Sequence, residues 1–478
     1  MTGPYLVGID QGSQSTKVVV FDASGVPVCE GREPLRPSHM PRPGVVEHPD
    51  DDLWDGLCAA TRAAMHEFPG RPEEIAGVGL CTIRFCRAML RADGSLASPV
   101  LSWMDARVPL PYRHEDPSVA HVTASSGYVG ARLTGRFADT YANYAGQWPF
   151  DADALDWLPA RADGSYEGTD VRRDMLFDLV APGEVLGPLT ASAAAATGLP
   201  AGVPVVATAN DKAVEALGCG LVDSGTLLVS LGTYIAAMVV GDRNATGLSA
   251  SWTNYACEPG KYLFESHGIR RGMWTVSWLR DLLGPSLVAQ AAAENRGVED
   301  IMNEAAAHVP PGSDGLMTVL DWLAPTDAPY RKGVMLGFDA RHGWAHLYRS
   351  VVEGIALTMR ARIDEALAEL ALAPSHAVVS GGGAASDVVM QVFADVLDRP
   401  VRRPATSSAA ALGAAVCAAA GAGLAPSVEA AAGRMVRAGT VFEPRPDAVD
   451  VYARLLDVHR SITAHTDPLL QRSYEIFH

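Results

Sequence analysis

A β-strand, a polar–x–Gly–hydroxyl turn and a second strand occur twice in this chain. The first copy contains IDQGS at residues 9–13 and the second contains VSLGT at residues 229–233, each between two apolar runs. Two such hairpins predict two related halves, whose turns face each other across a cleft and direct backbone amides at one anion. Two unrelated hairpins are the alternative, because acids and glycines are common in turns of every kind.

The length and the charge of the chain limit the class of protein. A chain of 478 residues is too long for one hydrophobic core, so we expect two domains, residues 1–222 and 223–478. The net charge of −17 argues against a protein that binds nucleic-acid phosphates or an anionic membrane surface. A nucleotide site is still allowed, because local amides and a metal ion can neutralise its phosphates.

The cysteines and the first residues indicate the compartment. The seven cysteines show no paired C-x-x-C spacing, which is typical of free thiols in a reducing cytoplasm. The segment MTGPYLVGID lacks a basic run followed by an apolar signal, and no apolar run reaches the length that spans a membrane. We therefore expect a cytoplasmic protein with neither a nucleic-acid nor a membrane partner.

Apolar periodicity predicts the elements around these hairpins. Residues 48–68 are expected to form an amphipathic helix with an acidic first turn, and residues 87–103 a hairpin that turns at an Asp-Gly pair. The alanine-rich segment 407–423 contains good helix formers with small side chains. It predicts a tightly packed, buried helix without a chemical role.

A glycine triplet follows a third strand in the second half of the chain. The strand ends at Ser380, residues 381–383 are all glycine, and Ser386 or Asp387 is placed to cap the next helix. Glycines let a ligand approach the backbone, and a helix N-terminus favours negative charge. A dinucleotide-binding turn is disfavoured, because Ser386 stands where that motif has its third glycine, and no phosphate-binding loop ending in Gly-Lys-Ser/Thr occurs.

Asp211 follows a strand and opens a helix in the segment NDKAVEALGCG. Phosphoryl transfer needs a metal ion to shield the phosphates, donors around the moving group, and a carboxylate that deprotonates the attacking hydroxyl. Asp10, the two turns and Asp211 would supply these parts. A plain helix-capping role for Asp211 is the alternative.

Together these segments resemble the FGGY family of carbohydrate kinases, over nearly the whole chain and in order. The most specific match is GVMLGFDARHGWAHLYRSVVEGIA, residues 333–356, with Phe338 where the family usually has a smaller aliphatic residue. The resemblance implies an α/β protein of two actin-like (RNase H-like, ASKHA) ATPase domains with a central cleft between them. It also implies an ATP- and Mg²⁺-dependent kinase that phosphorylates a small sugar or polyol.

The resemblance assigns roles to individual residues. Asp211 matches the catalytic base, and Asp10 matches the acid near the Mg²⁺ ion and the phosphates. Gly272 matches a glycine near the nucleotide, although close packing at a helix explains it equally well. The remaining nucleotide contacts are implied in the two turns and in the adenosine motif: Gly12, Ser13, Gln14, Gly232, Thr233, Gly382, Gly383 and Ser386.

Four residues match positions that contact the sugar in relatives. Arg84 stands where some members grip substrate hydroxyls, and Phe85 stands where glycerol and xylulose kinases have polar residues. Asp105 resembles an acid that follows a tryptophan, with Arg107 as its expected ion-pair partner. Lys212 follows the base, where relatives often present a sugar-binding side chain. A salt-bridged Arg84 and an exposed Lys212 are the alternatives.

The chain also departs from the family pattern. Residues 108–126 are much shorter than the corresponding family segment, which walls part of the sugar pocket, and Arg270 and Arg271 replace small residues. The two arginines could meet an anionic group of the substrate or pair with the acidic surface. We expect a ketopentose such as xylulose as acceptor, and a homodimer. A catalytically silent sugar-binding member and an actin-like ATPase binding module are the alternatives.

Overall fold

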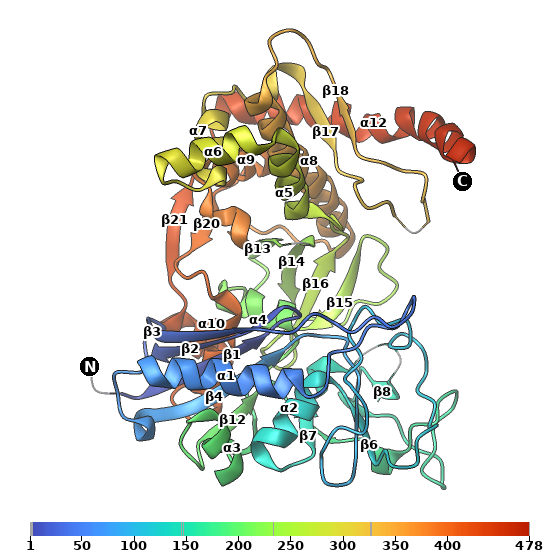
Figure 1. Ribbon diagram of the computed structural model, residues 1–478, viewed down its shortest axis with the longest axis vertical. Coiled ribbons are helices and arrows are strands. Elements are labelled where there is room, and N and C mark those ends of the chain that lie inside the picture. Colours follow the sequence, from blue (N-terminus) through green and yellow to red (C-terminus); the bar gives the residue numbers. More distant parts are fainter. Residues whose placement is uncertain (1–2, 145, 147, 233, 326, 478) are drawn as a thin grey trace.

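Each half of the chain is built on its own mixed β-sheet (Figure 1). The computed structural model describes residues 3–144, 146, 148–232, 234–325 and 327–477. The first sheet has the strand order β11-β12-β4-β1-β2-β3, in which β1 is antiparallel to β2 and parallel to β4. Its strands are β1 Tyr5–Gln11, β2 Ser15–Asp22, β3 Pro27–Pro34, β4 Ile75–Thr82, β11 Val185–Pro188 and β12 Pro204–Ala207.

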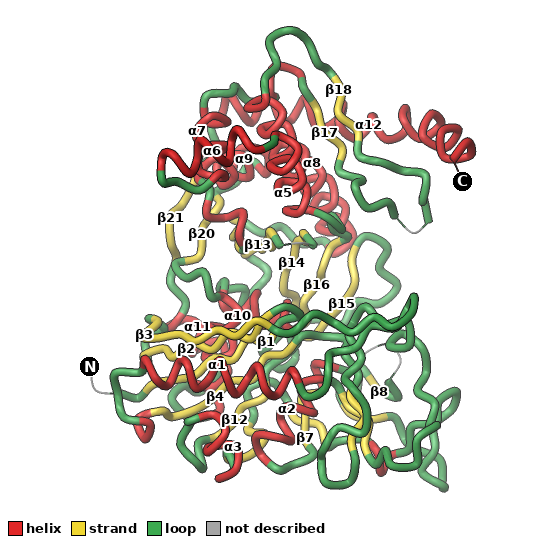
Figure 2. Tube along the Cα trace, viewed as in Figure 1, coloured by secondary structure: helices red, strands yellow, loops and turns green. Residues whose placement is uncertain are grey.

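Helices cover both faces of the first sheet (Figure 2). Because side chains alternate along a strand, Val7 and Ile9 of β1 pack against one helical layer, whereas Leu6 packs against the other. The first layer contains α1 Asp52–Glu67, α2 Ser125–Thr134 and α3 Ala191–Thr197. The second contains α4 Asp211–Gly218, α10 Ala409–Gly421 and α11 Val428–Met435.

The second sheet has the strand order β15-β16-β14-β13-β19-β20-β21. Its strands are β13 Thr226–Leu231, β14 Ile235–Gly241, β15 Ser251–Tyr255, β16 Tyr262–Ser266, β19 His376–Ser380, β20 Val401–Pro404 and β21 Ala438–Phe442. The helices of this half are α5 Gly272–Leu283, α6 Pro285–Glu294, α7 Val298–Ala307, α8 Trp344–Leu370, α9 Asp387–Leu397 and α12 Pro446–Phe477. In the part of the chain that is described, no helix has both the length and the apolar content needed to cross a membrane.

The shorter elements lie outside the two sheets. Four strand pairs are formed by β5 Ala88–Leu90 with β6 His121–Thr123, β7 Ala138–Thr140 with β10 Asp178–Val180, β8 Phe150–Asp151 with β9 Asp156–Trp157, and β17 Met317–Val319 with β18 Val334–Leu336. The short 3₁₀ turns are η1 Pro72–Glu74, η2 Tyr141–Asn143, η3 Arg173–Met175, η4 Ser313–Gly315 and η5 Gly382–Ala385.

The alanine-rich helix α10 joins the two halves. Its residues share one core with Leu6 of the first sheet and Val378 of the second, which confirms the prediction of a tightly packed buried helix. The contact with β1 is so close that a Cβ on Gly8 would lie 1.8 Å from the carbonyl oxygen of Ala411. The proposed boundary between residues 222 and 223 falls in the loop between α4 and β13, yet α10 packs on the first sheet.

The hairpin predicted for residues 87–103 is present in an irregular form. Isolated antiparallel bridges join Leu90 to Leu96 and Arg87 to Leu101, on either side of a turn in which Gly94 donates to the carbonyl of Arg91, and β5 takes β6 as its strand partner. The short segment 108–126 supplies β6 and also Tyr112, which belongs to a small separate core with Tyr144 and Trp157. The local turn therefore forms as predicted, and packing of the segment 108–126 adds the longer strand pairing of β5 with β6.

Candidate active site

A cavity of about 720 Å³ lies between the two halves of the chain. The first half contributes the end of β1, a side chain of β2 and the first turns of α4. The second half contributes the end of β19 with the glycine turn, the end of β20, and the start of α10. The lining residues are Asp10, Lys17, Asp211, Lys212, Glu215, Ser380, Gly381, Gly382, Ala384, Ala385 and the run from Arg403 to Ala410.

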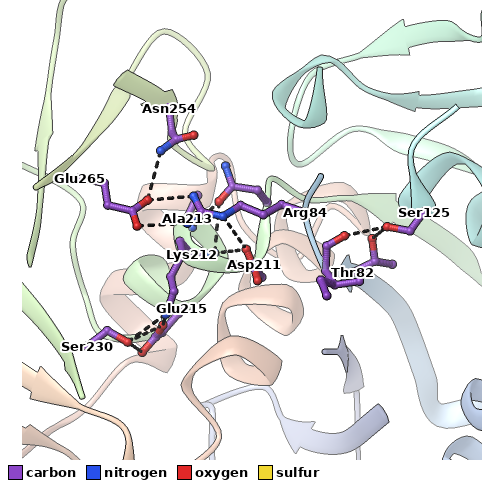
Figure 3. Close-up of polar contacts among 12 residues, drawn as sticks. Thr82, Arg84, Ser125, Asp211, Lys212, Ala213, Glu215, Ser230, Asn254 and Glu265 are labelled. Carbon is purple, nitrogen blue, oxygen red and sulfur yellow. Dashed lines mark hydrogen bonds and ion pairs between the residues drawn. The ribbon is translucent and has the colours of Figure 1, made fainter. Parts of the chain in front are cut away.

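Asp211 is the first residue of α4, but it is not the helix cap. Asn210 caps the helix, because its side-chain oxygen accepts the backbone N–H groups of Lys212 and Ala213, each at 3.1 Å. The Asp211 carboxylate lies 3.5 Å from Nε of Arg84 (Figure 3). Burial raises the pKa of Asp211, while Arg84 and Lys212 oppose that rise. Its Oδ1 atom also accepts the backbone N–H of Lys212 at 2.9 Å, and the side chain lines the cavity between the two halves.

Asp10 lies at the end of β1 and lines the same cavity. Burial, together with the negative charges of Asp211 and Glu215, raises the pKa of Asp10 to about 6, although Lys17 and Lys212 oppose the rise. Carboxylates crowded in this way are stabilised by a cation. Among the described residues, no three acidic, histidine or cysteine side chains are grouped to hold a metal ion by themselves. A Mg²⁺ ion here would need phosphate oxygens as well, which is its usual mode of binding.

We expect Asp10→Asn to stabilise the metal-free protein at pH 7 but not at pH 4. An acid whose pKa is higher in the folded chain, here about 6 against 3.8, loses stabilising free energy as the pH rises through that interval. The asparagine has no such loss, so the difference in unfolding free energy should grow by about 2–3 kcal/mol between pH 4 and pH 7. Urea unfolding in the presence of a chelator measures this. If the unfolding free energies of the two proteins changed with pH in the same way, the raised pKa of Asp10 would be contradicted.

Lys212 is bound within the cavity rather than exposed. Its Nζ atom lies 2.9 Å from Oε2 of Glu215 and 3.0 Å from Oγ of Ser230. Glu215 in turn accepts hydrogen bonds from Ser230 at 2.8 Å and from Ser380 at 2.6 Å. Glu215 was not predicted as a site residue, although its position one helical turn after Asp211 places it on the same face of α4. These contacts tie α4 to the second sheet.

The two repeated hairpins meet at α4. Asp10 of the first hairpin and Ser230 of the second hold equivalent places: Asp10 lines the same cavity as Glu215, and Ser230 donates to Glu215. This arrangement supports the interpretation of the hairpins as related halves of one site. In the first turn, Gly12 donates to the carbonyl of Ser15, and Ser13 and Gln14 are exposed. In the second turn, Gly232 accepts from the amide of Met273, and Thr233 lies outside the described residues.

The glycine triplet reaches the cavity only in part. Gly381 and Gly382 line it, and nothing lies within 4 Å of a Cβ built on Gly382. Gly383 instead packs on the side chains of Leu231 and Met273. The triplet therefore leaves open backbone on the cavity side, as a nucleotide requires.

Ser386 and Gly272 have structural partners. Ser386 caps α9 by accepting the amide of Val389 at 3.3 Å, and its hydroxyl donates to Asn303 at 2.7 Å. A Cβ on Gly272 would lie 2.3 Å from the side chain of Ile235. Close packing at the start of α5 therefore explains this glycine, and neither residue lines the cavity described above.

Arg84 and Phe85 lie in the loop that follows β4, on the other side of Asp211. Arg84 donates from Nη1 and Nη2 to the two carboxylate oxygens of Glu265, at 2.8 and 3.0 Å. Phe85 has a φ of 59° and leaves 48% of its surface exposed, with the Arg84 guanidinium 5.1 Å from its ring centroid. Arg84 is thus salt-bridged, and its contact with a sugar stays a prediction. Glu265 was not predicted as a site residue, although it is an acid near the end of an apolar strand, the same pattern that singled out Asp10.

Asp105 is not brought into the cleft. Its side chain is fully buried and accepts hydrogen bonds from the amide of Val46 at 2.7 Å and from Arg107 at 2.7 and 2.8 Å. Arg107 also pairs with Glu47 at 2.7 Å. The expected ion pair between Asp105 and Arg107 is thus confirmed, and it fixes a loop instead of presenting free oxygens to a sugar.

Two α/β halves with a cavity between them form a two-domain fold of the actin-like (ASKHA) type. The chain belongs to the FGGY family of carbohydrate kinases. The N-terminal domain of that family matches residues 5–113 and 111–218, and its C-terminal domain matches residues 227–422. The protein is therefore a phosphotransferase acting on a sugar hydroxyl, and kinases of this family use ATP as phosphate donor.

Similar proteins cover all or nearly all of the chain. The uncharacterized sugar kinase YgcE of Escherichia coli (strain K12) is 48% identical over 479 residues, which cover 100% of this chain and 97% of that protein. Autoinducer-2 kinase of Escherichia coli (strain K12) is 27% identical, covering 94% of this chain and 92% of its own. The crystal structure of xylulose kinase from Rhodospirillum rubrum has a TM-score of 0.81 and 25% identity, covering 98% of this chain and 100% of that one.

Proposed function

We propose that this protein transfers the γ-phosphate of ATP to a hydroxyl of a small sugar or polyol, with a ketopentose such as xylulose as the first acceptor to test. The observation that carries the proposal is the place of Asp211. It lies between the large cavity on one side and Arg84 on the other. A base in that place can face a nucleotide and an acceptor at once.

The cavity suits the phosphates of ATP. The first residues of α10, Ala409 and Ala410, line it, and no side chain caps this helix, so its terminal N–H groups are available to an anion. Lys17 and Lys212 also line the cavity, where Lys17 is paired with Glu30 at 3.0 Å and Lys212 with Glu215 at 2.9 Å. Asp10 would hold Mg²⁺ together with phosphate oxygens, and the ion would supply charge neutralisation at the transferred group.

The acceptor hydroxyl would lose its proton to the Asp211 carboxylate as it attacks the γ-phosphate. The raised pKa of Asp211 makes it a stronger base than an ordinary aspartate. The Nε group of Arg84, 3.5 Å from Asp211, keeps the carboxylate oriented. Closure of the two halves around the ligands would exclude water, which otherwise competes as acceptor.

The choice of a ketopentose rests on two observations. The segment around Asp10 and the DAR segment at residues 105–107 look more like pentulose and linear-polyol kinases than like glycerol kinases. A xylulose kinase is also among the structural neighbours at 25% identity. We also propose a homodimer, for which light scattering should return about twice the chain mass of 50.4 kDa.

A panel of acceptors tests the proposed function. ADP release is measured with ketopentoses, pentitols, hexitols, glycerol and their phosphates, each with ATP and Mg²⁺. We expect turnover that depends on one group of ketoses or polyols and is absent with ATP alone. An ATP hydrolysis rate that no acceptor changes would contradict the proposal and favour an ATPase binding module.

A further inference from the structure

Glu265 and Arg84 form a bidentate ion pair between the two halves of the chain (Figure 3). Glu265 lies on β16 of the second sheet and is fully buried, whereas Arg84 comes from the loop after β4. The guanidinium edge with Nη1 and Nη2 has the shape that recognises a carboxylate or a phosphate group. Here the protein's own carboxylate occupies that edge.

Glu265 is held in this place from its own sheet. Its Oε2 atom also accepts hydrogen bonds from Nε1 of Trp252 at 3.2 Å and from Nδ2 of Asn254 at 3.4 Å, both on the neighbouring strand β15. A buried carboxylate with several donors is costly to move away from its partners. Glu265 therefore stays on Arg84, and an incoming anion would have to displace it.

We propose that Glu265 is a specificity-determining residue that makes the acceptor site select neutral, hydroxyl-bearing compounds and reject acceptors that carry a carboxylate or a phosphate. This inference rests on the proposed function, because Asp211 and Arg84 mark the acceptor site only if Asp211 is the base. Arg84, Asp211 and Glu265 together carry a net charge of −1. An anionic substituent would meet two carboxylates and a guanidinium that is already neutralised.

The other cations near the cleft are held by other groups of the protein, and Arg270 and Arg271 are exposed to solvent, which screens their charge. Lys212 is paired with Glu215. Arg270 donates to the carbonyl of Ala324 at 2.8 Å, and Arg271 stacks on Trp274 at 4.5 Å from the ring. A neutral acceptor needs none of these charges, because its hydroxyls can donate to a carboxylate and accept from Nε of Arg84.

Matched acceptors with the same carbon skeleton test the inference. We expect kcat/KM for a pentitol or ketopentose to exceed that for the corresponding pentonate by more than about a hundredfold. Glu265→Gln keeps the shape, removes the negative charge and frees the charge of Arg84, so this ratio should fall at least about tenfold. A Glu265→Gln variant that keeps the wild-type ratio would overturn the proposal, as would a wild-type enzyme that uses the pentonate equally well.

Two further variants separate charge selection from loss of structure. In the double variant Arg84→Gln, Glu265→Gln, both charges are absent, so selection against the pentonate should return towards the wild-type ratio although turnover is lower. Glu369→Gln on α8 is the matched control, because this carboxylate also accepts hydrogen bonds, from Ser249 and Ser251, but lies outside the site. It should leave the ratio unchanged.

Failure of the proposed function would look different. If no compound of the panel is phosphorylated, calorimetric binding of the same pentitol and pentonate pairs to the protein decides the inference. Preferential binding of the neutral member, lost in Glu265→Gln, would support it. Preferential binding of the pentonate to the wild-type protein would overturn it.

Discussion

Asp211→Asn is expected to reduce sugar-dependent ATP turnover by at least about a thousandfold, because it removes the proton acceptor for the attacking hydroxyl. The amide keeps the size of the carboxylate and its place beside Arg84 but cannot take the proton. The measurement is kcat for ADP release at saturating acceptor. Residual activity within about tenfold of the wild type would mean that Asp211 is not the base.

Asn210→Ala is the control that separates chemistry from folding at this helix. Asn210 caps α4 through two backbone amides, so the alanine should cost about 1 kcal/mol of stability. It leaves the Asp211 carboxylate in place. We expect it to lower the urea midpoint while retaining most turnover, whereas Asp211→Asn should keep the midpoint and lose turnover. The reverse pattern would assign the loss to the helix and not to the base.

Gly218→Ala is expected to destabilise the protein by about 2–3 kcal/mol, although alanine is the better helix former. A Cβ on Gly218 would lie 1.8 Å from the carbonyl oxygen of Ala409, a backbone atom that cannot move away by itself. The two helices α4 and α10 must therefore separate. Because α4 begins with Asp211 and the start of α10 lines the cavity, we also expect a lower kcat.

Gly433→Ala is the same glycine-to-alanine substitution, but we expect it to change the stability in the opposite direction. Gly433 lies within α11, and no heavy atom lies within 4 Å of a Cβ built on it. The alanine should therefore stabilise the protein by about 0.5–1 kcal/mol through helix propensity alone. Urea unfolding of both variants checks the pair. Equal shifts in the same direction would show that the contact between α4 and α10 is looser than described.

The fold was predictable because its signals are local. The repeated hairpins at Asp10 and Ser230 and the acid that opens α4 are short patterns. Asp10 and Asp211 line one cavity, and Ser230 donates to Glu215 of the same lining. The composition of the alanine-rich segment predicted a buried helix. The sequence did not predict that α10 packs on the first sheet, because the close contact of Gly8 with Ala411 joins residues from opposite ends of the chain.

The acceptor side was harder to predict for the same reason. The ion pair of Arg84 with Glu265 joins the two domains, and no sequence pattern near either residue predicts that the other is its partner. Asp105 was expected at the sugar because of its neighbours, but its oxygens are used by Val46 and Arg107. Local patterns identify which residues carry charge, whereas tertiary packing decides which of those charges remain free.

The central claim is that phosphate passes from ATP to a sugar at Asp211, and the fate of the γ-phosphate tests it most directly. ATP labelled in the γ-phosphate is incubated with Mg²⁺, the protein and the best acceptor of the panel, and the products are separated. We predict that the label appears in a sugar phosphate in proportion to the ADP formed, and that Asp211→Asn abolishes it. Label that appears only in inorganic phosphate, at a rate that neither the acceptor nor the substitution changes, would contradict the account.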